Sequence, residues 1–203
     1  MTALLLLLLA QPVGVFENPE PFKVLESRDG LVLSGRPIKG TKYSEYQVTS
    51  DTPYPAAALC EHIYEWATKG TGHPGVKLRK VLKDGPDERV VYNQIEQSVV
   101  SDRDYALTVV RRREPDGTCR IRFWTSNELA PPKPAGFVRM ERLWGGWRFE
   151  PLPGGKARLT YTLFADPAGS IPAFLVHGPQ KSAAKDSVIA GLRQVKTALA
   201  AKK

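Results

Sequence analysis

The chain is poor in the residues that metal and redox chemistry requires. Its 203 residues include two cysteines, two methionines and three histidines. No H-E-x-x-H, C-x-x-C or G-x-S-x-G pattern occurs, and these spacings are typical of zinc sites, redox disulfides and serine nucleophiles. We therefore expect no metal, no cofactor and no catalytic triad. His62 and His177 are better interpreted as surface or interface residues than as metal ligands.

No apolar run is long enough to span a bilayer, which takes about 20 residues. The leucines from Leu4 to Leu9 resemble the apolar core of a secretory signal, although no Lys or Arg precedes them and no small-x-small cleavage site follows. We interpret residues 1–14 as a signal peptide or an apolar N-terminal segment. If the run is a signal, the protein is exported, periplasmic or secreted; otherwise it is cytoplasmic.

The two cysteines leave the redox state open. Cys60 and Cys119 are compatible with one disulfide in an oxidising compartment and equally with two buried thiols.

Overall composition is that of one soluble globular domain. Hydrophobic residues make up 42% and charged residues 25% of the chain. The formal net charge of +8 favours anionic partners, either nucleic acid or an acidic membrane surface. Charge alone does not choose between them.

Most of the chain beyond residue 20 alternates between apolar and polar residues, as half-buried strands do. Turn residues such as Asp29-Gly30 and Asp116-Gly117 separate these segments. One helix follows Pro55, because Leu59, Ile63 and Trp66 recur at helical spacing. Seven strands are predicted before residue 130: 22–26, 31–38, 43–49, 76–82, 89–99, 105–113 and 120–126.

Two further strands are predicted between residues 136 and 166, which brings the total to about nine. In the first of them the apolar phase changes from Val138 and Met140 to Trp147 and Phe149. We attribute the change to a β-bulge at Gly145-Gly146, which would bend the sheet.

From Ser170 onward the pattern is helical, with Pro172 in the first turn. A break at Gly178-Pro179 is expected, because proline interrupts a helix. An apolar stripe then repeats at helical spacing: Val188, Leu192, Val195 and Leu199.

Several short motifs in a fixed order resemble the START (steroidogenic-acute-regulatory-related lipid transfer) domain family. The resemblance covers roughly residues 21–199, and we place the START-like lipid-binding domain at 20–200. The matching motifs are Arg103-Asp104-Tyr105 followed by Arg111-Arg112-Arg113, then Val138-Arg139, Gly145-Gly146-Trp147, Leu159-Thr160-Tyr161, Asp166-Pro167 with Gly169, and Ile171-Pro172. The implied fold is the α+β helix-grip fold, a curved antiparallel sheet wrapped around a long C-terminal helix.

The resemblance implies that one hydrophobic molecule, of lipid type, binds in an internal cavity between the sheet and the final helix. Periodicity alone does not distinguish such a cavity from a solid core. We expect a monomer that contacts an anionic membrane surface transiently and does not bind nucleic acid. The implied ligand contacts are Tyr105, Leu107, Val109, Ile121, Phe123, Val138, Met140, Trp147, Tyr161, Leu163, Val188 and Leu192.

Some sterol-binding members of the family carry a buried acidic residue paired with arginine. The corresponding places here are near Val90 and at Val109, both apolar. This departure predicts a plainly apolar cargo, or one oriented by the hydroxyls of Tyr105 or Tyr161 and by backbone groups. Ligand exchange would require the final helix or the loop 98–103 to move, with Gly178-Pro179 as a hinge.

Two other functions compete with lipid binding. A cyclase-like or hydratase-like enzyme could use the same cavity, with Tyr161, Glu96 or Asp104 as proton carriers, by analogy with other helix-grip proteins. The basic run 111–113 suggests nucleic acid, but it precedes a turn and lacks accompanying exposed aromatics, so we interpret it as a solvated strand end. With the lysines of the last helix it could instead contact acidic lipid headgroups.

Overall fold

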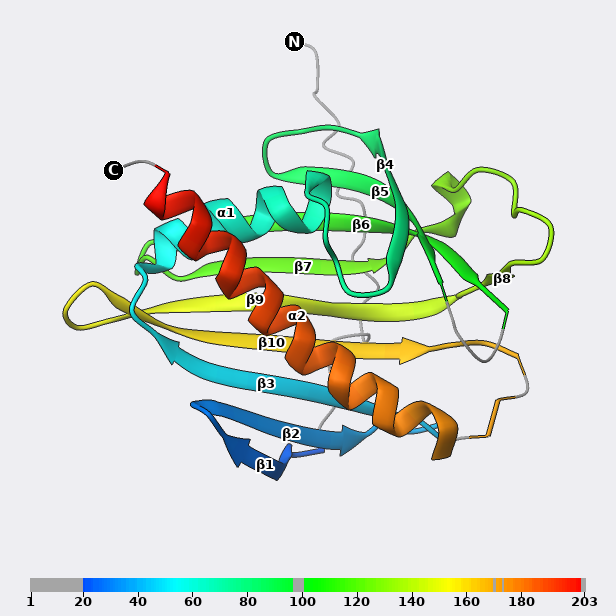
Figure 1. The fold of residues 1–203 in the computed structure, drawn as a ribbon, viewed down its shortest axis with the longest axis horizontal. Helices are drawn as coiled ribbons and strands as arrows, with labels where there is room; N and C mark the ends of the chain where they lie inside the picture. Colours follow the sequence, from blue (N-terminus) through cyan, green and yellow to red (C-terminus); the bar gives the residue numbers. More distant parts are fainter. Residues whose placement is uncertain (1–19, 97–100, 170, 173, 202–203) are drawn as a thin grey trace, which may run out of the picture.

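The computed structural model describes residues 20–96, 101–169, 171–172 and 174–201. Its strands form one sheet in the order β1-β2-β3-β10-β9-β7-β6-β5-β4, while β8 pairs with β6 beside this path (Figure 1). Every strand pair is antiparallel except β6 with β8. The bounds are β1 Lys23–Arg28, β2 Leu31–Pro37, β3 Ser44–Thr52, β4 Val76–Lys83, β5 Glu88–Ile95, β6 Arg103–Arg113, β7 Cys119–Thr125, β8 Val138–Arg139, β9 Arg142–Leu152 and β10 Lys156–Asp166.

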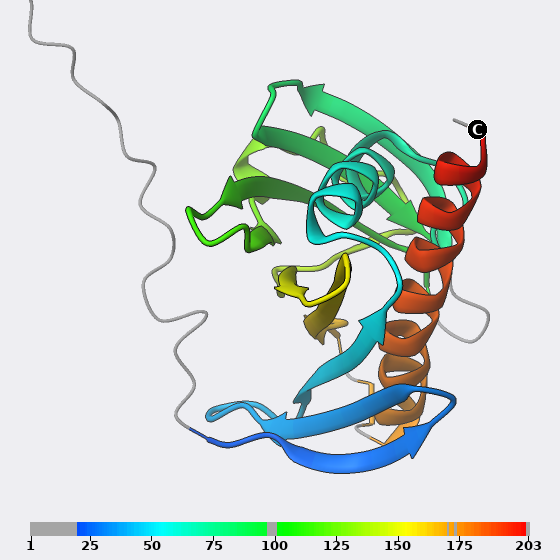
Figure 2. The same cartoon turned by 90° about the vertical axis from the view of Figure 1, so that its left-hand side faces the viewer.

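The sheet curves, and both helices lie on its concave face, which we call the inner face. In Figure 2, β1 and β2 form one side of the curve, β4 and β5 form the other, and the long helix α2 (Phe174–Ala200) crosses the open side. The shorter helix α1 (Ala56–Lys69) lies between α2 and the upper strands. This is the predicted α+β helix-grip architecture, with ten strands rather than nine. The predicted N-terminal segment, residues 1–14, lies outside the described residues.

The β-bulge predicted at Gly145-Gly146 is wrong. Strand β9 pairs with β10 and with β7 without any shift of register. The apolar phase changes because β8 and β9 are separate strands, so Val138 and Trp147 do not share one alternation. A Cβ atom on Gly145 would lie 2.1 Å from the carbonyl oxygen of Thr162. Glycine is therefore required here because the neighbouring backbone approaches too closely for a side chain.

Helix α1 forms where the apolar spacing predicts it, and a disulfide attaches it to the sheet. Leu59 and Ile63 are fully buried. Cys60 is bonded to Cys119 of β7, with 5.9 Å between the Cα atoms. Of the two alternatives left open by the sequence, the structure has the disulfide.

Helix α2 begins at Phe174, so Pro172 precedes the helix instead of lying in its first turn. The break predicted at Gly178-Pro179 is absent, because the helix continues through Pro179. It crosses α1 at Gly191, where a Cβ atom would lie 2.8 Å from Ile63 Cδ1. Within the described part of the chain, neither helix is long and apolar enough to cross a bilayer.

The interpretation of the basic run 111–113 as a solvated strand end is wrong for its first residue, Arg111. Arg111 is buried under α1 and lies 2.9 Å from Glu61 and 2.8 Å from Asp87. Arg113 pairs with the same two carboxylates at 2.9 and 3.1 Å. Only Arg112 is left for a partner outside the fold, because the other two cations hold α1 to the β4–β5 turn.

Candidate ligand-binding site

The inner face brings together nearly all the predicted ligand contacts. Val138 is the exception: it is half-buried on β8 beside the start of β6 and is not part of the apolar cluster. Nine of the others are buried members of one cluster and two pack against it, which makes eleven of twelve. The nine are Tyr105, Leu107, Val109, Ile121, Phe123, Met140, Trp147, Tyr161 and Val188, and the two are Leu163 and Leu192.

A row of cross-strand neighbours forms the centre of this cluster. Ile121 pairs directly with Trp147, and Trp147 pairs directly with Tyr161. The Trp147 and Tyr161 ring centroids are 4.2 Å apart. Because each residue faces the same side of the sheet as its partner, the row places three large side chains side by side beneath α2.

Burial is uneven across the inner face. Leu59 and Ile63 of α1 have no exposed surface. Four inward-facing residues of β6, β7 and β10 keep 6–9% of their surface accessible although the helices cover this face: Tyr105, Leu107, Phe123 and Tyr161. These four side chains are buried but keep slightly more accessible surface than Leu59 and Ile63.

Two polar side chains, Arg79 and Asn93, also face inward, and the sequence pattern did not single them out. Arg79 Nε donates to Asn93 Oδ1 at 2.7 Å, and Arg79 Nη1 donates to the carbonyl oxygen of Ala67 at 2.9 Å. The two residues are direct cross-strand partners, and Asn93 in turn pairs with Tyr105. The interior therefore contains a polar pair, at positions other than the two that the sequence comparison with sterol-binding members pointed to.

Strand orientation explains why this pair lies elsewhere. Val90, where an acidic counterpart was sought, alternates with the inward-facing Val91 and so lies on the outer face. Asn93 has the same phase as Val91 and Ile95, both of which belong to the inner cluster or pack on it. The sequence did contain one signal for Asn93: it is a polar residue at a position where the strand alternation expects an inward-facing apolar one. Arg79 gave no such signal, because charged residues recur along the edge strand β4.

The tyrosine hydroxyls of the inner face are neutral hydrogen-bonding groups. Burial raises the pKa of Tyr105, and the charge of Arg79 opposes this shift only in part. Burial also raises the pKa of Tyr161, against a smaller opposing effect of its hydrogen bond with Ser187. Burial lowers the pKa of the Arg79 guanidinium. Both tyrosines suit the orientation of a ligand better than proton transfer at neutral pH.

Two of the three proposed proton carriers do not reach this face. Asp104 is fully buried on the opposite side of β6, where it accepts from Arg139 Nε at 3.1 Å and from the Tyr92 hydroxyl at 2.9 Å. Glu96 is largely exposed, and its carboxylate lies 3.9 Å from Lys77 Nζ. Of the three carriers named for an enzyme, only Tyr161 contacts the interior.

Two of the three histidines, His73 and His177, make structural contacts. His73 stacks on Trp66 with 3.8 Å between ring centroids, and its Nε2 lies 2.7 Å from the Trp66 carbonyl oxygen. Burial, aided by the charge of Arg79, lowers the pKa of His73 to about 3. His177 Nδ1 lies 3.0 Å from the Tyr46 hydroxyl. Across the described ranges, no three His, Cys, Asp or Glu side chains are grouped as metal ligands would be.

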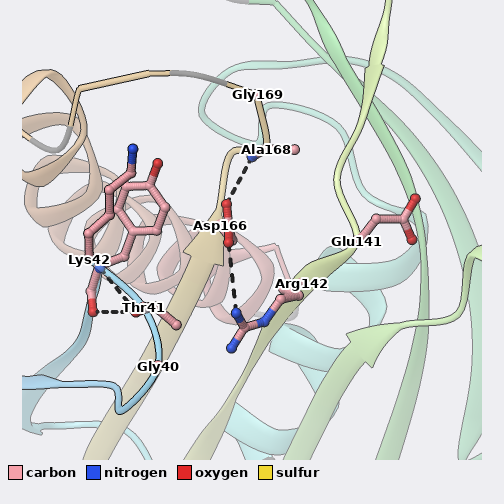
Figure 3. A pocket seen from close by; sticks show the side chains of 9 residues that line it. Gly40, Thr41, Lys42, Glu141, Arg142, Asp166, Ala168 and Gly169 are labelled. Carbon is pink, nitrogen blue, oxygen red and sulfur yellow. Dashed lines mark hydrogen bonds and ion pairs between the residues drawn. The ribbon is translucent and has the colours of Figure 1, made fainter.

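A separate hollow of about 380 Å³ opens at the surface where the β2–β3 turn meets the end of β10 (Figure 3). Most of its polar side chains already have partners within the fold. Asp166 lies 4.0 Å from Arg142 Nη1 and also accepts from the Ala168 backbone N–H. Lys42 donates to the carbonyl oxygen of Ile171 at 2.8 Å. Such a lining does not suit an apolar ligand, so the inner face remains the candidate site.

Two solved structures of similar fold carry the name of lipid-transfer proteins. A solved structure of a STAR-related lipid transfer protein from Xanthomonas axonopodis matches with a TM-score of 0.77 at 20% identity, over 86% of this chain and 98% of that one. Human StAR-related lipid transfer protein 5 matches with a TM-score of 0.70 at 22% identity, over 87% of this chain and 86% of that one. At these identities the matches show the shared fold.

Sequence comparison gives the family. The START domain family model matches residues 61–201, and the chain belongs to this family. An uncharacterized protein of Pseudomonas aeruginosa is 28% identical over 176 residues, which covers 84% of this chain and 85% of that protein.

Proposed function

We propose that this protein binds one hydrophobic ligand, of lipid type, between the inner face of the sheet and helix α2, and carries it between membranes without chemical change. The observation that carries the proposal is the incomplete burial of Tyr105, Leu107, Phe123 and Tyr161 on a face that the helices cover. Apolar and aromatic side chains with a few convergent polar groups are the usual lining of a small-molecule site. Membership of the START family supports the same conclusion.

Entry would proceed at the N-terminal end of α2, which two hydrogen bonds attach to the sheet and in which Pro179 lies. The Tyr46–His177 hydrogen bond attaches the helix to β3, and Gln180 Nε2 donates to the carbonyl oxygen of Ala165. Pro179 supplies no N–H to the helical ladder, so bending is easiest at this point. The other expected gate, the loop 98–103, lies partly outside the described residues.

The disulfide is consistent with a carrier that works in an oxidising compartment. The Cys60–Cys119 disulfide joins two elements far apart in sequence, and disulfides persist outside the reducing cytosol. Together with the leucine run at residues 4–9, this supports export. The net charge of +8 favours transient contact with an anionic membrane surface, although Arg111 and Arg113 are engaged in the fold.

A pair of tryptophan substitutions on one helix tests the proposal. Leu192→Trp adds volume on the buried side of α2, whereas Ile189→Trp adds the same ring on the exposed side, where Ile189 is 44% accessible. We expect Leu192→Trp to abolish uptake of an uncharged fluorescent lipid from vesicles and Ile189→Trp to retain it. Equal uptake by the two folded variants would show that the ligand does not lie beneath α2.

A further inference from the structure

The side-chain amide of Asn93 has a nitrogen with no acceptor. Asn93 is fully buried, and its Nδ2 has no hydrogen-bond partner in the described structure. Exchanging the amide oxygen and nitrogen does not remove the problem. Arg79 offers only donors, so the Asn93 oxygen must face Arg79 and the NH2 group must face away. Burying an amide N–H without a hydrogen-bond acceptor costs free energy, unless another molecule accepts from it.

Arg79, like the buried Arg103, bonds to carbonyl oxygens, whereas three other arginines of this sheet pair with carboxylates. Arg36 pairs with Glu45, Arg111 with Glu61 and Arg139 with Asp104. No carboxylate in the described part of the chain lies within ion-pairing distance of Arg79, which bonds to Asn93 and to carbonyl oxygens at the C-terminus of α1. These carbonyls satisfy donors but carry only a partial negative charge. A half-buried cation thus lacks a full counter-charge.

The two groups lie beside the buried inner-face side chains that keep some accessible surface. Tyr105 is the direct cross-strand neighbour of Asn93, and Leu107 follows it on the same face of β6. Phe123 and Tyr161 continue this accessible surface towards β10, with ring centroids 6.3 Å apart. A molecule placed here would have its polar end at Asn93 and its apolar part along Leu107 and Phe123.

We propose that the ligand is a long-chain carboxylic acid whose carboxylate accepts from Asn93 Nδ2 and compensates the charge of Arg79. This inference rests on the proposed function and narrows its ligand class. One spare amide donor and one cation match a small head with a single negative charge. A neutral hydroxyl would accept from the amide but would leave the guanidinium without a counter-charge.

The first test compares two ligands that differ only at the head. Dodecanoic acid and dodecanol would each displace N-phenyl-naphthylamine, an uncharged fluorescent probe, from the full chain at pH 8. We expect the acid to bind about ten- to a hundred-fold more tightly, the range for hydrogen bonds to a charged group. Equal affinities would overturn the carboxylate inference and leave hydrophobic binding intact. Binding of neither ligand nor probe would overturn the proposed function itself.

Three variants test the assigned residues. Asn93→Asp supplies an internal carboxylate to Arg79, and Arg79→Met removes the cation. Both should abolish the preference for the acid, measured within each variant as the ratio of the affinities for dodecanoic acid and dodecanol, which should fall to about one. Lys80→Met, the exposed neighbour on β4, removes the same charge and should keep the preference. If Arg79→Met does not fold, Asn93→Asp decides, because an undiminished acid preference in that variant contradicts the inference.

Discussion

Removing the disulfide should destabilise the protein without changing its fold. The double variant Cys60→Ala/Cys119→Ala deletes the bond between α1 and β7 while the buried neighbours Leu59 and Ile63 keep α1 on the sheet. The two cysteines are 59 residues apart, so the bond closes a long loop in the unfolded chain. Its main effect is therefore on the entropy of the unfolded state.

The magnitude follows from the loop length. For a loop of about 60 residues, chain-entropy arithmetic gives a stabilisation of about 4 kcal/mol at 25 °C. With a urea dependence of about 2–3 kcal/mol/M, this corresponds to a midpoint lower by about 1.3–2 M. Because both cysteines are almost completely buried, the alanines also remove some packing, which acts in the same direction.

Urea unfolding followed by tryptophan fluorescence measures the effect. The oxidised wild type, the wild type with reductant and the double variant should be compared, and the last two should unfold at similar urea concentrations. A midpoint unchanged within about 0.3 M in the double variant would refute the entropic argument. An intact mass showing two free thiols in the protein purified without reductant would refute the bond itself.

Two other substitutions test local contacts. Gly145→Ala should lower the free energy of unfolding by about 1–3 kcal/mol, because its Cβ would overlap the carbonyl oxygen of Thr162. Gly178→Ala has open space around it and should stabilise α2 by up to about 1 kcal/mol. Equal thermal midpoints for the two variants would contradict this difference. The pKa of His73 is lowered to about 3 in the folded protein. As the pH decreases below about 6.5, the unfolded chain therefore binds a proton at this residue while the folded protein does not, and stability falls. Between pH 6.5 and 5.5 the free energy of unfolding should fall by about 1 kcal/mol. His73→Phe keeps a ring on Trp66, and its stability in chemical denaturation should depend less on pH.

Local patterns in the sequence predicted the elements and most of the inner face, because strand alternation decides which residues share a side. Ile121, Trp147 and Tyr161 lie together as expected. The phase change at β9 was misassigned, since a bulge and a break between two strands produce the same shift of apolar residues. Pro179 did not break α2, because a helix already packed on a sheet tolerates the loss of one hydrogen bond.

The polar part of the site could not be predicted in the same way. Arg79 is directed inward by Asn93 and by carbonyl oxygens of α1, and neither partner is close to it in sequence. Arg111 is likewise buried only because Glu61 and Asp87 reach it from a helix and a turn. Pairings between distant segments decide both cases, and a basic run carries no local sign of them.

Native mass spectrometry of the gently purified protein tests the central claim most directly, with extraction and identification of whatever accompanies the chain. We expect one hydrophobic molecule per protein, absent from Leu192→Trp and present in Ile189→Trp. A wild-type protein that carries no such molecule and takes none up from lipid vesicles would contradict it.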